Sequence, residues 1–374
     1  MGKVACINPK TNIPDNFKYV DLESVVGTSL IKAKLTTKQL APSRAQRVAK
    51  KGDIFYQTVR PYQKNNFLFD INNYDFQYVF STGYAQLRSE INNYFLFSYL
   101  QRQRFVNLIL RRSTGTSYPA ISSKDLSEIK IIFPRNSKEQ ENIGKIINLI
   151  DALITLQQRK MEQLKQLKKA LLQQLFVEKN SKHPSLRFKN FNGDWEERKL
   201  SDIANYRNGK AHEQYIDMNG IYTVVNSKFI STNGKVKKFS NEPIELLKKG
   251  EIAFVLSDVP NGKALAKAYL IDSDNKYSLN QRIAGISPSS DINSYFLYVL
   301  MNRNRYFLKF DDGVGQTNLS KKDIEEFKEN YPLFDEQQKI ANLFSQIQAL
   351  ISLQQNKHTQ LIALKKYLLQ KLFI

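Results

Sequence analysis

The chain is a tandem duplication. Residues 139–176 align with residues 336–373 at an offset of 197, and 21 of the 38 aligned positions are identical. A weaker correspondence extends upstream, where Gly52-Asp53-Ile54 aligns with Gly250-Glu251-Ile252. Internal repetition constrains the architecture more than any local motif does. The order along the chain is therefore a variable domain, a repeated segment, a second variable domain and a second repeated segment.

Both repeated segments are predicted to be long amphipathic helices, because apolar residues recur every three or four positions. Thirty-eight helical residues would span about 57 Å. Sustained heptads are typical of a coiled coil, and two equal copies in one chain favour pairing with each other. Two independent surface helices are the alternative. A polar glutamine at the same place in each copy would pair and help to fix the register of a seam made of Ile143, Ile150, Gln157, Leu164 and Leu171 with Ile340, Ile347, Gln354, Leu361 and Leu368.

These features predict an α+β fold: two mixed α/β domains separated by two long helices that form an antiparallel coiled coil, a tandem repeat with pseudo-two-fold symmetry. Antiparallel pairing would place the two domains at opposite ends of a rod. Ser137 with Gln140, and Asp335 with Gln338, are expected to cap the helix starts. The expected boundaries are residues 1–136 for domain one, 137–179 for the first long helix, 180–334 for domain two and 335–374 for the second long helix.

Within the two domains, short β-like runs alternate with helical patterns without a regular βαβ rhythm. The sequence predicts strands at residues 53–59, 77–80, 129–133, 221–226, 251–256, 266–271 and 282–286. It predicts helices at residues 93–110 and 295–310, with short ones starting at Ser123 and Ser320.

The balance of charge points to a polyanionic partner. The formal net charge is +21 and the pI is about 9.7, which favours nucleic acid first and an anionic membrane surface second. The single cysteine, Cys6, excludes an intramolecular disulfide framework, and the three histidines lie far apart, so no structural zinc is expected. With no long apolar run and no signal-peptide core at the N-terminus, we expect a soluble, cytoplasmic chain.

No catalytic motif is present in the sequence. It lacks a Gly-x-x-x-x-Gly-Lys-Ser/Thr phosphate loop, a Gly-x-Ser-x-Gly elbow and the Asn/Asp-Pro-Pro-aromatic tetrapeptide of amino-methyltransferases. Asp258-Val259-Pro260-Asn261 lacks the order of that tetrapeptide and is interpreted as a loop. The chain is therefore predicted to be non-catalytic, with no metal of its own.

DNA contacts are predicted on the domain loops, because basic residues bind phosphates while Arg, Asn and Gln read base edges. Tyr84, Tyr118 and Tyr222 are candidates for stacking on a base. Six further arginines are either helix-surface charge or phosphate contacts flanking the site: Arg102, Arg104, Arg111, Arg112, Arg303 and Arg305. The Lys168-Lys169 and Lys365-Lys366 pairs on the long helices face solvent, an acidic partner surface or the DNA spacer. The candidates are, in domain one, Arg44, Arg47, Gln57, Arg60, Tyr62, Lys64, Asn65, Thr116, Ser117 and Tyr118, and in domain two, Lys210, Asn226, Lys228, Ser257, Asn261, Lys263, Asn280, Gln281, Arg282, Gln316, Thr317 and Asn318.

Several motifs together resemble the specificity (S) subunit of Type I restriction–modification systems, and the resemblance extends over essentially the whole chain. The Trp-containing segment that opens domain two has no counterpart in the first half. The residues that carry the resemblance are 186–200, Ala41-Pro42-Ser43-Arg44-Ala45-Gln46-Arg47, Lys51-Gly52-Asp53-Ile54, Val59-Arg60-Pro61-Tyr62, Thr114-Gly115-Thr116, the step from Phe133-Pro134 to Glu139-Gln140, and the helix ends at 168–173 and 365–370.

The resemblance implies two target-recognition domains, each reading one half of a split, asymmetric double-stranded DNA target. It implies two methylation subunits that carry S-adenosylmethionine and modify adenine, and restriction subunits that use ATP and Mg²⁺. The long helices would serve as the spacer and as the platform for these partners. The alternatives are the recognition part of a Type IIB/IIG-like methyltransferase–nuclease, and a basic coiled-coil structural protein.

Overall fold

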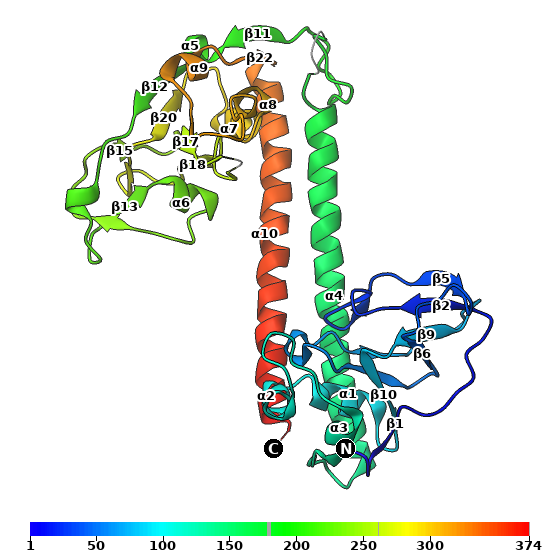
Figure 1. Ribbon diagram of the computed structural model, residues 1–374. Helices are drawn as coiled ribbons and strands as arrows, with labels where there is room; N and C mark the ends of the chain where they lie inside the picture. Colours follow the sequence, from blue (N-terminus) through cyan, green and yellow to red (C-terminus); the bar gives the residue numbers. More distant parts are fainter. Residues whose placement is uncertain (178–180, 261, 374) are drawn as a thin grey trace. The chain divides into compact units, whose positions relative to one another are not determined.

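The computed structural model describes residues 1–177, 181–260 and 262–373 (Figure 1). The chain divides into two compact units, residues 1–160 with 354–374 and residues 161–353. Two 38-residue helices, α4 (Ser137–Gln174) and α10 (Phe334–Lys371), each contribute to both units. The expected end of the first helical segment at residue 179 and the expected start of domain two at residue 180 lie outside the described residues.

The globular part of the first unit is built on two four-stranded sheets. One has the order β1-β10-β7-β8 and is antiparallel, while the other has the order β5-β2-β9-β6, with β2 parallel to β9. A hairpin of β3 and β4 is added. The strands are β1 (Ala5–Ile7), β2 (Asn16–Val20), β3 (Val25–Val26), β4 (Ser29–Leu30), β5 (Lys34–Thr37), β6 (Ala45–Val48), β7 (Ile54–Gln57), β8 (Phe67–Leu68), β9 (Tyr78–Ser81) and β10 (Tyr84–Ser89). The helices are η1 (Pro61–Gln63), α1 (Asn93–Leu100), α2 (Gln103–Arg112) and α3 (Ser123–Glu128).

The second unit has the same two sheets. Its orders are β12-β20-β16-β18 and β14-β13-β19-β15, and β13 and β19 form the parallel pair. Two short pairs, β11–β22 and β17–β21, are added. The strands are β11 (Glu196–Lys199), β12 (Ala204–Asn208), β13 (Tyr222–Val225), β14 (Phe239–Ser240), β15 (Leu246–Leu247), β16 (Ile252–Val255), β17 (Ser257–Asp258), β18 (Ala268–Leu270), β19 (Tyr277–Leu279), β20 (Ile283–Pro288), β21 (Thr317–Asn318) and β22 (Lys328–Tyr331). The helices are α5 (Leu200–Ile203), η2 (Glu213–Tyr215), α6 (Ser227–Ser231), α7 (Ser294–Met301), α8 (Arg305–Leu308) and α9 (Lys321–Glu325).

The duplication therefore extends through the domains, although their sequences share few residues. The predicted α+β class, with two β-rich domains and two long helices that pack together, is confirmed. Three predicted elements differ. Residues 129–133 form no strand, and each predicted long domain helix is broken, into α1 and α2 and into α7 and α8. The breaks fall at Gln101-Arg102 and Asn302–Asn304, where the chain turns between the paired helices.

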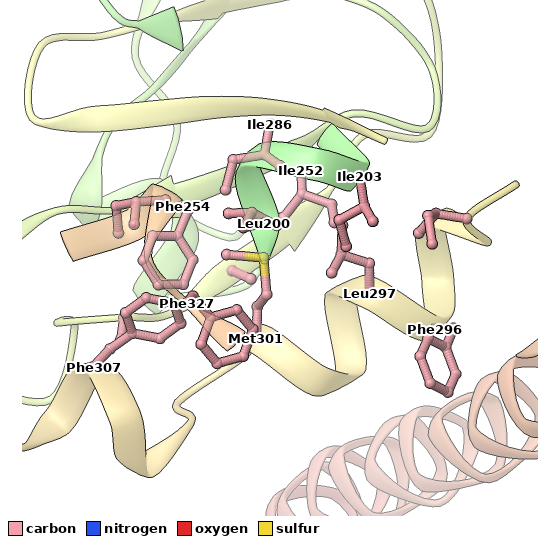
Figure 2. Close-up of a cluster of buried hydrophobic side chains, with 14 of the residues drawn as sticks. Leu200, Ile203, Ile252, Phe254, Ile286, Phe296, Leu297, Met301, Phe307 and Phe327 are labelled. Carbon is pink, nitrogen blue, oxygen red and sulfur yellow. The ribbon is translucent and has the colours of Figure 1, made fainter. Parts of the chain in front are cut away.

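The core of the second domain joins its sheet to its helices (Figure 2). Ile252, Phe254 and Ile286 project from β16 and β20 towards Leu297 and Met301 of α7, and all five are fully buried. The ring of Phe254 lies 4.8 Å from that of Phe307, centroid to centroid. Burying one such side chain contributes about 1.5–3 kcal/mol, so this cluster holds α7 and α8 against the sheet.

The ends of both long helices insert an aromatic ring into a domain core. In the first unit the ring of Phe373 lies 5.2 Å from Phe95 and 5.9 Å from Tyr99. In the second unit its repeat counterpart, Phe176, lies 5.3 Å from Phe296 and 5.9 Å from Phe344. The C-terminal end of each helix therefore packs against the domain that precedes the other helix in sequence.

The two helices are antiparallel in each unit. In the first unit Asp151 of α4 forms an ion pair with Lys365 of α10, with an N–O distance of 2.5 Å. In the second unit Lys168 of α4 donates to Gln348 of α10 at 2.8 Å. Positions that increase along α4 thus meet positions that decrease along α10. The predicted pairing of antiparallel helices is confirmed at this level.

The predicted seam is only partly buried. Ile143, Ile150, Ile340 and Ile347 are buried, whereas Leu164, Leu171, Leu361 and Leu368 are half-buried. The predicted glutamine pairing is wrong, because the Oε1 atoms of Gln157 and Gln354 are both buried and accept no hydrogen bond from the described residues. Asp151 lies opposite Lys365 in an antiparallel pair. With this register, Gln157 and Gln354 are offset along the helices and do not lie opposite each other.

The predicted helix caps are also wrong. The glutamines that recur in both copies, Gln140 and Gln337, form hydrogen bonds to other elements instead. Gln140 donates to the Pro134 carbonyl at 2.8 Å and accepts from the Asn92 N–H at 3.2 Å. Gln337 makes the same two bonds, to Pro332 at 2.9 Å and from Asn293 at 2.9 Å. Each glutamine joins the start of a long helix to the start of a domain helix. The backbone N–H of Lys138 is capped by Asn136 instead.

Candidate nucleic-acid interface

Two loops of the first domain that the sequence singled out lie side by side. Val59 pairs with Ala120, and the Arg60 N–H donates to the Pro119 carbonyl at 2.8 Å. The Arg60 guanidinium lies 4.3 Å from the centre of the Tyr118 ring, a cation–π contact. Tyr118 is 62% exposed, and Tyr62 on the same surface loop is 49% exposed. A cation held over an exposed ring can contact a phosphate or a base edge without losing its support.

The backbone of this loop is held in an uncommon conformation. Arg60 and Lys64, which flank η1, both adopt left-handed φ angles of 53° and 56°. Such residues cost about 1–3 kcal/mol and persist where surrounding structure fixes them. Here the fixing group is Gln57. Its amide donates to Gln63 at 2.9 Å and accepts from the Asn65 N–H at 3.3 Å.

Gln57 is therefore removed from the residues predicted to read DNA. Its side chain is buried and its amide is engaged within the loop. The side-chain Oδ1 of Asn65 likewise accepts from the Gly27 N–H at 2.9 Å. Both residues position the loop that presents Arg60, Tyr62 and Lys64. Thr116 and Ser117 are exposed on the neighbouring loop.

Arg44 and Arg47 belong to a different part of the first domain. They lie beside or on β6, in the sheet that does not carry Arg60. Arg47 lines a polar cavity of about 540 Å³ with residues 8–13 and Gln46. Its Nε atom has no hydrogen-bond partner among the described residues, and burial lowers the pKa of its guanidinium. The Nε–H donor of Arg47 is therefore unused within the described residues.

In the second domain, the β17–β21 pair takes the place that Arg60 and Tyr118 have in the first. Ser257 is in register with Asn318, as Val59 is with Ala120. Ser257 and Thr317 are both buried, and Ser257 accepts from the Gln316 amide at 2.7 Å. Asn318 and Gln316 remain exposed. The same place in the fold thus presents Arg and Tyr in one domain and amides in the other.

A second group in this domain gathers at the turn between β19 and β20. Lys210 is bridged to Asn280, and its carbonyl accepts from the Gln281 N–H at 2.9 Å. Arg282 is exposed with a φ of 66°. Two carboxylates face this group: Glu245 lies 3.1 Å from the Lys210 ammonium, and Glu213 accepts from Gln281 at 2.6 Å. Arg282 is therefore the cation of this group that forms no ion pair among the described residues.

The remaining candidates do not gather with these groups. Asn226 is a helix cap, since its side chain accepts from the Phe229 N–H at 2.9 Å, and this replaces the predicted contact with a base. Lys228 and Lys263 are exposed. Asn261 lies outside the described residues. Tyr84 is fully buried beside Phe55 and Phe80, so the prediction that it stacks on a base is wrong.

Two other properties of the described chain bear on its function. Across residues 1–177, 181–260 and 262–373, no three His, Cys, Asp or Glu side chains are placed to hold a metal ion. In the same stretches, no helix combines the length and apolar character needed to cross a membrane.

Arg60 gives the sharpest mutational test of the first-domain loop. We expect Arg60→Ala to weaken DNA binding about tenfold, because a charge-assisted hydrogen bond of about 1.5–3 kcal/mol is lost. Partner assembly should be unchanged, since Arg60 belongs to a domain loop, where it contacts Tyr118, and not to either long helix. Fluorescence anisotropy with duplex DNA measures the first quantity and size-exclusion chromatography the second. Undiminished affinity would remove Arg60 from the interface.

Two domains with one topology and unlike exposed loops, each followed by the same long helix, define a two-domain recognition protein. A family model described as the Type I restriction modification DNA specificity domain matches residues 9–166 and 192–363. These matches cover most of the chain, once in each half, and the chain belongs to this family.

Individual relatives agree with the family match. The MjaVIII specificity subunit of Methanocaldococcus jannaschii is 26% identical over 279 residues, which are 70% of this chain and 65% of that protein. The HindI specificity subunit of Haemophilus influenzae is 27% identical over 173 residues, 45% of this chain and 37% of that protein. The matched region thus spans less than two thirds of each relative.

Two solved structures share the fold. One is the Type I restriction–modification S subunit from M. genitalium, with a TM-score of 0.68 and 19% identity, covering 100% of this chain and 94% of that chain. The other belongs to a study of complex assembly and conformational transition of the type I system. Its TM-score is 0.54 at 19% identity, with 100% and 96% covered.

Proposed function

We propose that this chain is the DNA-recognition subunit of a Type I restriction–modification complex and reads a bipartite, asymmetric DNA target, one half-site with each domain. The observation that carries the proposal is the repeated topology with unlike exposed side chains at the same place. Arg60 and Tyr118 occupy that place in one domain, and Gln316 and Asn318 in the other. Side chains of different donor and acceptor pattern select different bases.

The chemistry is proposed to reside in partner subunits. The sequence holds no phosphate loop and no amino-methyltransferase tetrapeptide. S-adenosylmethionine would be held by a methylation subunit, and ATP with Mg²⁺ by a restriction subunit. This chain would choose where they act. Because DNA would be the substrate of the complex, the complex would act in the cytoplasm.

Repeated apolar residues on the long helices support two copies of one partner. Leu153 and Leu156 of α4 are 37% and 44% exposed. Their repeat counterparts Leu350 and Leu353 of α10 are 45% and 46% exposed. Exposed apolar side chains at regular helical spacing are typical of a protein-binding surface. Because both helices carry the same pair, the surface favours two identical methylation subunits.

Reconstitution tests this proposal. The chain is co-expressed with the methylation gene adjacent to its own, and transfer of the labelled methyl group from S-adenosylmethionine to plasmid DNA is measured. We expect transfer only when both chains are present, and saturation at a fixed number of methyl groups per plasmid. Equal methylation without this chain, or methylation at every adenine, would contradict the proposal.

A further inference from the structure

A cavity of about 550 Å³ lies in the first unit, where α2 begins beside the C-terminal turns of α10, and it has one basic wall and one apolar wall formed by Ile362, Leu369 and Phe373. Its polar wall includes Lys64, Gln101, Arg102, Arg104, Lys365 and Lys366. Five of these six are cations, and no carboxylate of the described residues lines the cavity. The sequence analysis named Arg102, Arg104 and the lysine pair as separate candidates. It did not predict that they lie together with Lys64 and Gln101.

The positive charge of the cavity is mostly uncompensated. Lys365 is paired with Asp151 at 2.5 Å, whereas Lys64, Arg102, Arg104 and Lys366 form no ion pair with a carboxylate of the described residues. Burial, together with the charge of Lys365, lowers the pKa of the Lys64 ammonium. Cations that crowd a partly buried space favour an anion there.

Two donors in the cavity wall are buried without an acceptor. Arg102 is 7% exposed and Gln101 is 6% exposed. The Nη1 atom of Arg102 and the Nε2 atom of Gln101 have no hydrogen-bond partner among the described residues. The Arg102 guanidinium lies near two rings, 4.6 Å from the centre of Tyr99 and 5.1 Å from that of Phe373. These cation–π contacts support the side chain but give this N–H group no acceptor.

The equivalent arginine in the second unit is satisfied. Arg303 lies at the break between α7 and α8, as Arg102 does between α1 and α2, and its Nη1 donates to the Leu265 carbonyl at 3.1 Å. A buried donor without an acceptor destabilises the fold, so the difference between the units requires a reason. A ligand acceptor at the first site supplies one.

The start of α2 adds to the same surface. This ten-residue helix begins at Gln103, and among the described residues the side chain of its N-cap residue, Arg102, makes no capping hydrogen bond. Free N–H groups and the positive end of the helix dipole attract anions. The helix start, the two unpaired donors and the cations thus meet in one place.

We propose that this cavity binds one phosphate of the DNA backbone beside the half-site read by the first domain. The inference rests on the proposed function and deepens it. Lys64 connects the cavity to the DNA-reading loop, because it lines the cavity and also ends the η1 loop that presents Arg60 and Tyr62. DNA held against that loop passes next to the cavity. The phosphate contact sets the register of the duplex on the domain without reading sequence.

The test compares two arginines of one helix. Arg104 lines the cavity, and Arg111 is exposed in the last turn of α2 outside it. Arg104→Gln and Arg111→Gln remove the same charge, and both side chains are exposed, so both variants should fold. Each is purified as the full chain with its methylation subunit. Binding is measured against a duplex that carries the methylated motif, and against a series in which single phosphates are replaced by neutral methylphosphonates.

We expect one phosphate position at which neutralisation weakens binding about tenfold for the wild type and for Arg111→Gln, but has little effect on Arg104→Gln. The slope of log affinity against log salt should be shallower by about 0.9 for Arg104→Gln than for Arg111→Gln. Identical behaviour of the two variants at every position would overturn the phosphate site. So would an Arg104→Gln effect confined to assembly with the methylation subunit, which would indicate an acidic protein partner. Absence of DNA binding by the wild-type complex would instead contradict the proposed function.

Discussion

Glu336→Ala is expected to destabilise the second unit by about 3–5 kcal/mol, because removing one partner of a buried ion pair leaves the other charge unpaired. Glu336 is 1% exposed at the start of α10. Both of its carboxylate oxygens accept from the Arg187 guanidinium, each at 2.8 Å. The hydrogen-bonded carboxylate raises the pKa of Arg187. An arginine is protonated at neutral pH even without such a partner, so Arg187 stays charged when Glu336 is removed.

The repeat supplies the control. Glu139 is the counterpart of Glu336 in α4, but it is exposed, because the Trp-containing segment that provides Arg187 has no copy in the first half. We expect Glu139→Ala to change stability by no more than about 0.5 kcal/mol. Urea unfolding followed by far-UV circular dichroism compares the two variants. The single tryptophan, Trp195, is buried in the second unit and reports the loss there by fluorescence. Equal midpoints for the two variants would contradict the account.

Deleting one heptad from both long helices is expected to shorten the DNA spacer and to leave both half-site sequences unchanged. The deletion removes residues 157–163 and 354–360. These segments lie between the Asp151–Lys365 ion pair and the Lys168–Gln348 hydrogen bond on both helices. The flanking contacts and the heptad phase are therefore preserved. Seven residues correspond to about 10 Å of helix, which limits the change to about three base pairs at roughly 3.4 Å each.

Methylation sequencing of cells that carry the deleted form measures the spacer. A deletion from α4 alone is the control, and it should abolish methylation, because the two helices then lose their register. An unchanged spacer in the double deletion, or changed half-site sequences, would contradict the spacer role of the helices.

The architecture could be predicted because repetition and helical periodicity are properties of long segments. Twenty-one identities in 38 positions locate both helices without knowledge of their contacts. Details that depend on tertiary contacts could not be predicted. Gln140 has the spacing of a capping residue after Ser137, yet it bonds to a proline carbonyl and to a domain helix, and in the second copy Gln337 does so in place of the predicted Gln338. The β-like run at 129–133 forms no strand, because apolar periodicity in a short run does not distinguish a strand from a buried loop.

The candidate site was predicted by residue type, and burial decides which of those residues remain in it. Arg60 and Tyr118, 58 positions apart, meet because β7 ends beside the loop that precedes α3. Gln57 and Asn226 have the side chains of base readers, but the fold uses their amides to hold a loop and to cap a helix. Gln101 gave no signal in the sequence. Only its buried, unpaired amide identifies it.

Long-read methylation sequencing tests the central claim most directly. DNA is compared from cells that express the chain with its adjacent methylation gene and from cells that lack this chain. The account predicts a split motif with two unlike halves and a fixed spacer, methylated on adenine in each strand and lost without the chain. A single continuous motif, or methylation that persists without the chain, would contradict recognition by two different domains.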